Sequence, residues 1–75
     1  MNKDIIKGNW DALKGKIKLQ WGKLTDNDVT KINGSHEILQ GKLQELYGYQ
    51  KDEAEKEINE FLSHHKLKDE EEENR

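Results

Sequence analysis

Cysteine is absent from this chain of 75 residues, which excludes disulfide bonds, thiolate metal ligands and thiol catalysis. Long apolar runs are absent as well. Residues 1–7 lack the apolar core of a secretory signal, and no stretch of about 18 apolar residues occurs that could span a membrane. We therefore expect a cytoplasmic protein that neither crosses a membrane nor leaves the cell by the secretory route.

Apolar residues are few: they make up 31% of the chain, against 39% charged residues, so core material is scarcer than in an ordinary domain. A chain this short buries only about 60% of the surface that its unfolded form exposes. A net charge of only -3, two Trp, two Tyr and one Phe nevertheless argue against general disorder. We expect one folded domain over residues 1–65 and a disordered acidic tail over residues 66–75.

The charges are unevenly distributed along the chain. Residues 1–25 carry six lysines and two aspartates, a net charge of +4, whereas residues 26–75 carry a net charge of -7. Such a division can steer a partner or pair one half of the molecule with the other, but it does not determine the fold.

The spacing of the apolar residues predicts an all-α protein with four helices, because they recur three and four residues apart and no strand-like alternation is sustained. Capping residues and glycines mark the ends of these helices. With their caps, the predicted helices extend from Asn2 to Gly22, Thr25 to Gly34, Ser35 to Gly48 and about Lys51 to His65. The predicted core residues are Trp10, Leu13, Ile17, Trp21, Ile32, Leu39, Leu43, Tyr47, Ile58 and Phe61.

An internal repeat of 26 residues relates the two halves of the chain. Shifting the sequence by this length produces seven identities in 26 pairs, where chance would give roughly two or three. Gly22 and Gly48 are one identical pair, and each follows a large aromatic residue. We predict that both adopt positive φ and reverse the chain, so that two packed α-hairpins share one core with Gly15 and Gly41 inside helices.

Several short motifs resemble the CsbD-like family of small bacterial proteins. They comprise Gly8-Asn9-Trp10, Leu13-Lys14-Gly15-Lys16, Trp21-Gly22-Lys23-Leu24-Thr25-Asp26, Gly41-Lys42, Tyr47-Gly48-Tyr49-Gln50-Lys51-Asp52 and Ala54-Glu55-Lys56-Glu57. The resemblance covers most of residues 1–62 and implies a compact helical fold and a role in the general stress response. It implies no catalytic residues, and the acidic tail departs from the family pattern.

Neither a metal site nor a catalytic site is predicted. His64, His65 and Glu60 are the nearest approach to a metal-binding group, but neighbouring residues on a helix point about 100° apart and cannot both face one ion. Ser35 and Ser63 stand at helix edges, and Ser35 is more simply an N-cap. We therefore expect no cofactor, no metal and no enzymatic activity.

Nucleic-acid binding is the alternative hypothesis. Four lysines are spaced to form one ridge along the first predicted helix: Lys3, Lys7, Lys14 and Lys18. Duplicated helical hairpins also occur in modules that bind phosphate. The two glycine turns, however, lack the Gly-x-Gly sequence of such modules, the only arginine is Arg75, and the chain is acidic overall. We rank this hypothesis below the leading one.

A second face of the first predicted helix carries small and apolar residues: Ile5, Gly8, Ala12, Gly15 and Leu19. It is either a surface for a partner or the contact for another helix of the same domain, and we favour the latter. The leading hypothesis is a non-enzymatic, monomeric protein of the stress response that acts by binding or by general protection. The sequence does not identify its partner: a protein is a candidate, and no membrane partner is expected.

Overall fold

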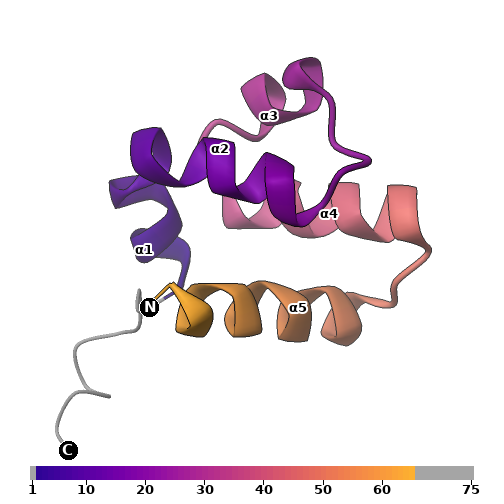
Figure 1. Ribbon diagram of the computed structural model, residues 1–75. Helices are drawn as coiled ribbons and strands as arrows, with labels where there is room; N and C mark the ends of the chain where they lie inside the picture. Colours follow the sequence, from indigo (N-terminus) through magenta and orange to yellow (C-terminus); the bar gives the residue numbers. More distant parts are fainter. Residues whose placement is uncertain (1, 66–75) are drawn as a thin grey trace, which may run out of the picture.

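A computed structural model describes the backbone of residues 2–65 and the side chains of residues 5–65, and this part of the chain is all-helical (Figure 1). Its five helices are α1 (Asn2–Gly8), α2 (Trp10–Gln20), α3 (Asp26–Ile32), α4 (His36–Tyr47) and α5 (Lys51–His64). The predicted all-α class is confirmed. The predicted tail, residues 66–75, lies outside the described residues.

The first predicted helix is divided in two, which raises the helix count from four to five. At Asn9 the backbone leaves the helical conformation, with φ -118° and ψ 22°. The Asn9 side-chain amide donates a hydrogen bond to the Ile5 carbonyl at 2.9 Å, which also accepts one from the Asn9 backbone N–H at 3.1 Å, so Asn9 closes the last turn of α1. Since Gly8 is also a poor helix former, Gly8-Asn9 breaks the helix, and α1 turns its buried Ile6 toward α4.

The N-terminal ends of α3 and α4 follow the capping signals in the sequence. The Thr25 hydroxyl accepts a hydrogen bond from the Asp28 backbone N–H at 3.1 Å, while the Asp28 carboxylate accepts one from the Thr25 N–H at 3.0 Å. Ser35 caps α4 by accepting a hydrogen bond from the Ile38 N–H at 3.2 Å. Each cap satisfies backbone donors that the first helical turn leaves without partners.

The predicted conformation of the two glycine turns is right at one glycine and wrong at the other. Gly48 has φ +73° and closes α4 in the left-handed conformation. Gly22 is not among the positive-φ residues of the described chain. α2 ends at Gln20, one residue before the position that corresponds to the end of α4, and five residues link it to α3, against three between α4 and α5. This longer link reverses the chain without a left-handed glycine.

A left-handed turn instead joins α3 to α4, where Asn33 has φ +44° and Gly34 has φ +85°. A Cβ atom added to Gly34 would lie 3.3 Å from the Lys7 Cα and 3.6 Å from the Trp10 Cβ. Only glycine therefore combines this backbone conformation with so close an approach to the corner between α1 and α2.

One hydrophobic core is enclosed by all five helices. α4 packs against α1, α3 and α5, and α2 packs against α1 and α3; Figure 1 shows α4 and α5 side by side, joined by a short link. The Trp21 and Phe61 rings, whose centroids are 5.2 Å apart, connect the end of α2 with α5. Buried apolar side chains come from every helix and from the loop after α2: Ile6, Leu13, Ile17, Trp21, Leu24, Ile32, Leu39, Leu43, Ala54, Ile58, Phe61 and Leu62.

The helices follow the 26-residue repeat. A shift of 26 residues takes the bounds of α2 to residues 36–46 and those of α3 to residues 52–58, close to the bounds of α4 and the first part of α5. Leu13 and Leu39 are both buried, as are Ile17 and Leu43. Gly15 and Gly41 both lie inside helices. The helices and several inward positions therefore correspond between the two units, whereas the turns between the helices do not.

Candidate partner-binding surface

The outer face of α2 is not covered by any described part of the chain. Ala12, Gly15 and Leu19 are all exposed, and Leu19 is 85% exposed. A Cβ atom at Gly15 would meet nothing within 4 Å. The expectation that another helix of the domain covers this face is therefore wrong, since α2 has one apolar face in the core and a second, narrower one in solvent.

Ile5 and Gly8 do not continue this face in the way that a single helix would. Both belong to α1, on the other side of the break at Asn9. Ile5 is partly buried and packs against the core, whereas Gly8 is exposed. The exposed surface is therefore confined to α2, and we call Ala12, Gly15 and Leu19 the α2 outer face.

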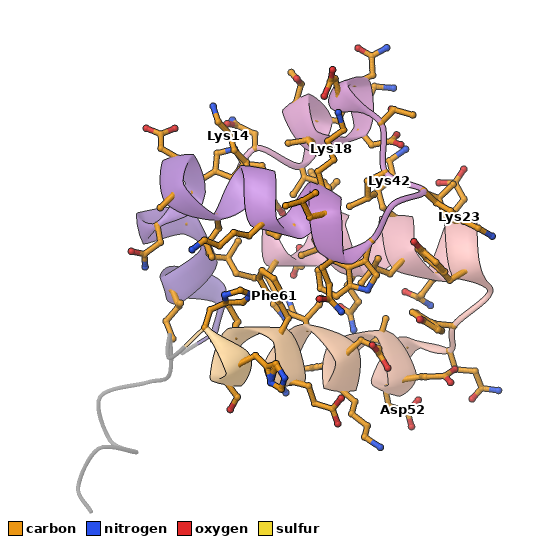
Figure 2. The ribbon with its side chains drawn as sticks, in the orientation of Figure 1. Lys14, Lys18, Lys23, Lys42, Asp52 and Phe61 are labelled. Atoms are coloured by element: carbon orange, nitrogen blue, oxygen red, sulfur yellow. The ribbon has the colours of Figure 1, made fainter. Side chains whose placement is uncertain are left out.

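The predicted lysine ridge is interrupted by the same break. Lys7 lies on α1, while Lys14 and Lys18 lie on α2, and the side chain of Lys3 lies outside the described residues. Figure 2 shows Lys14 and Lys18 on the side of α2 where α3 lies. Lys18 forms an ion pair with Asp26 at the start of α3. These lysines therefore do not make one continuous row along one helix.

The residues considered for a metal or catalytic site in the sequence are placed as follows among residues 5–65. Within that range no group of three or more His, Asp or Glu side chains could hold a metal ion. Ser35 is engaged as the cap of α4. A hollow of about 560 Å³ lies along α5, but polar side chains of that single helix line it, from Asp52 to His64.

A half-buried ion pair that the sequence did not reveal joins α3 to α4. The Lys42 ammonium lies 3.1 Å from the Asp28 carboxylate, and the two side chains are only 20% and 16% exposed. The hydrogen bond from the Thr25 backbone and then the bond from Lys42 lower the pKa of Asp28. Its bond with Asp28 raises the pKa of Lys42. Both shifts favour the charged pair, which holds α3 against α4.

A second unpredicted cluster joins the two links. The Lys23 backbone N–H donates a hydrogen bond to the Tyr47 hydroxyl at 3.1 Å, and its ammonium lies 5.1 Å from the centre of the same ring. Tyr47 and Tyr49 stack with centroids 5.4 Å apart. Burial, followed by the charge of Glu57, raises the pKa of Tyr49. Because Lys23 and Tyr49 pack around Tyr47, this cluster supports the fold and leaves no open aromatic platform at Tyr47.

The described helices include none that is both long and apolar enough to cross a membrane.

A further polar contact is a hydrogen bond at 3.0 Å from the buried Gln40 side chain to the Lys51 carbonyl, which fixes the start of α5 against α4. The α2 outer face, which carries the more exposed of the large apolar side chains among the described residues, is the surface that we consider for binding.

Comparison with known proteins places the chain among small bacterial proteins. The model of the family described as CsbD-like matches residues 4–56. The UPF0337 protein pc0632 of Protochlamydia amoebophila is 58% identical over 66 residues, which cover 88% of this chain and 100% of the relative. The UPF0337 protein YjbJ of Escherichia coli strain K12 is 64% identical over 58 residues, 77% of this chain and 84% of the relative. No solved structure matches.

Proposed function

Because the chain belongs to the CsbD-like family, we propose that it is a non-enzymatic cytoplasmic protein of the stress response that binds a protein partner through the α2 outer face. The link to stress comes from the family resemblance. The observation that carries the binding role is the 85% exposure of Leu19 on a helix whose opposite side is buried.

A partner would gain from covering this face. Burying a leucine side chain stabilises a complex by about 1.5 to 3 kcal/mol before the cost of association. Gly15 has no side chain, so a partner helix could approach the α2 backbone closely between Ala12 and Leu19. Leu13 and Ile17, on the inward side of α2, are already buried in the core. A partner could therefore bind the outer face without any rearrangement of the core.

General protection is the competing role, and the ordered core favours binding over it. A non-specific protectant acts through its hydrophilic composition, for which the mean hydropathy of -1.22 would suffice without a fixed fold. Among the described residues, twelve buried apolar side chains form one cluster, side chains cap the starts of α3 and α4, and α2 is held with one definite face outward. This order is what a specific surface requires.

Site-specific photocrosslinking in cells tests the proposal. A photoreactive phenylalanine analogue replaces Leu19, and the matched control carries it at Glu55, an exposed position on α5. We expect discrete adducts from position 19 in stressed cells, none from position 55, and loss of the adducts when Gly15→Gln is added. Equal diffuse labelling from both positions would support general protection, and the absence of adducts at position 19 would overturn the binding role.

A further inference from the structure

The 26-residue repeat produces a second exposed face that corresponds to the α2 outer face. The positions equivalent to Ala12, Gly15 and Leu19 are Ile38, Gly41 and Glu45 on α4, all of them exposed; we call these three the α4 outer face. Among the described residues, Leu19 and Ile38 are the exposed large apolar side chains, at 85% and 44%. The two therefore stand on equivalent helix faces.

Both faces allow close approach and both point away from the core. A Cβ atom at Gly15 or at Gly41 would meet nothing within 4 Å. On the opposite sides of α2 and α4, Leu13 and Leu39 are buried in the same core. A neighbouring molecule could therefore contact either outer face without disturbing the core or the other outer face. The distance between two packed helices depends on the side chains at the contact, and glycine sets the smallest distance.

The two outer faces differ in charge. Lys16 is exposed next to Ala12 and Leu19, four and three residues away along α2. On α4 the position of Leu19 is taken by Glu45, whose side chain is 67% exposed and whose closest basic group is Lys42 at 3.7 Å. An exposed pair of this kind contributes little to stability. The Glu45 carboxylate therefore remains available to a second cation.

We propose that the partner of the α2 outer face is the α4 outer face of a second copy of this chain, an inference that rests on the proposed binding role. Charge complementarity favours this pairing. Both faces have an acid four residues before the glycine, at Asp11 and Glu37, and Lys42, which corresponds to Lys16, is paired with Asp28 at 3.1 Å. The charges in which the faces differ are therefore the exposed Lys16 on α2 and Glu45 on α4, and contact between α2 and α4 can bring these two together. The net charges of +4 over residues 1–25 and -7 over residues 26–75 favour the same orientation.

Because two different faces meet, the contact does not close on itself in a dimer. Each added copy leaves one α2 outer face and one α4 outer face open, so assembly continues beyond two copies. The faces are small, and association is correspondingly weak and dependent on concentration. The protein is a monomer when dilute and forms short chains of copies when it accumulates.

Sedimentation of the purified full chain from about 10 μM to about 1 mM tests the inference, since weak contacts have dissociation constants in this range. We expect the average mass to rise beyond that of a dimer, and added salt to lower it. Lys16→Glu or Glu45→Lys alone lowers the association constant about tenfold or more. Mixing the two variants restores assembly, because each supplies the charge that the other has lost.

Lys31→Glu and Glu60→Lys are the matched controls, since they change the same charges at exposed positions on α3 and α5. We expect them to assemble as the unchanged protein does, and thermal melting checks that all four variants are folded. A monomer throughout the concentration range, or a mixture of the two variants that fails to associate, would overturn the inference.

The crosslinking experiment separates this inference from the proposed function on which it rests. Adducts from position 19 with the mass of two copies support both. Adducts with a different protein, together with a monomeric purified chain, overturn the inference and leave the binding role standing. The absence of any adduct, together with a monomeric chain, overturns both.

Discussion

The two repeat units, residues 10–32 and 36–58, share several buried apolar positions but have different turns and surfaces. Leu13 and Leu39 are both buried, as are Ile32 and Ile58. Gly48 is left-handed whereas Gly22 is not, and the exposed Leu19 corresponds to Glu45. A shared core constrains the volume and polarity of a side chain, whereas solvent does not, so similar inward patterns are compatible with divergent loops and faces.

The largest difference between the units is expected at the aromatic residues before the two glycines. Trp21 is buried against Phe61, and Trp21→Ala should destabilise the domain by about 3 to 5 kcal/mol, comparable to its whole stability. Tyr47 is only partly buried, and Tyr47→Ala should cost about half as much. Urea denaturation measures both variants, with Lys31→Ala as a surface control. Equal losses would mean that the two positions are equally important to the core.

Replacing the two glycines of the turns should separate the units next. Gly48→Ala forces a Cβ atom into a left-handed conformation at φ +73° and should cost about 1 kcal/mol. Gly22→Ala meets open space without positive φ, and its effect should stay within about 0.5 kcal/mol. The midpoint of thermal unfolding measures the difference. A loss at Gly22 as large as that at Gly48 would contradict the asymmetry between the turns.

Two other glycines should instead show that the units are alike. Gly15 and Gly41 lie inside helices, and a Cβ atom added at either position would meet nothing within 4 Å. Each replacement by alanine should therefore stabilise the domain by about 0.5 to 1 kcal/mol, because alanine loses less backbone entropy on folding. Calorimetry of both single variants and of the double variant tests this. A stabilisation at one position alone would show that the helices are not equivalent.

The smallest effect is expected from the ion pair between Asp28 and Lys42, which lies at the edge of the core. Hydrogen bonds with Thr25 and Lys42 lower the pKa of Asp28, so its contribution to stability is present above the pKa of an unfolded aspartate and is lost as the pH falls through the folded value. The pair joins the two units, since Asp28 lies in the first and Lys42 in the second. The positions that correspond to them are Ala54, which carries no charge, and Lys16, which is exposed. The pH dependence should therefore come from this one contact between the units and have no counterpart at the equivalent positions.

Asp28→Asn tests this pH dependence. The difference in urea midpoint between the unchanged protein and this variant should be greatest near neutral pH. It should shrink as the pH falls below the pKa of an unfolded aspartate and through the lowered pKa of folded Asp28, where the carboxylate takes up a proton. Asp26→Asn serves as a control of equal charge at an exposed position on the same helix. A difference that does not vary with pH would mean that the carboxylate charge does not stabilise α3.

Local signals in the sequence predicted most of the fold. Thr25 and Ser35 are short polar residues before apolar helical patterns, and both act as caps. The break at Gly8-Asn9 was also signalled, by two adjacent residues of low helix propensity, but the apolar rhythm from Ile6 to Trp21 outweighed that signal in the prediction. The same break interrupts the predicted lysine ridge, because that ridge required one unbroken helix.

The candidate surface depended on information that the sequence does not contain. The pattern of Ala12, Gly15 and Leu19 indicated a second face on the first predicted helix, but either of two partners could have covered it. The ion pair between Asp28 and Lys42 joins residues on different helices, and no local rule connects them. Whether the second face of α2 is covered, and which residues pair across α3 and α4, both depend on where neighbouring helices lie. The packing of the whole core sets these positions.

The sequence by itself thus determined the helical class, the caps at Thr25 and Ser35 and many of the inward residues, because these follow from interactions between residues a few positions apart and from the separation of apolar and polar faces. Only the tertiary structure decided that Gly22 needs no left-handed turn and that the outer face of α2 is exposed. These outcomes depend on link lengths and on the order in which helices pack around α4, and such contacts between distant residues leave no periodic trace in the chain.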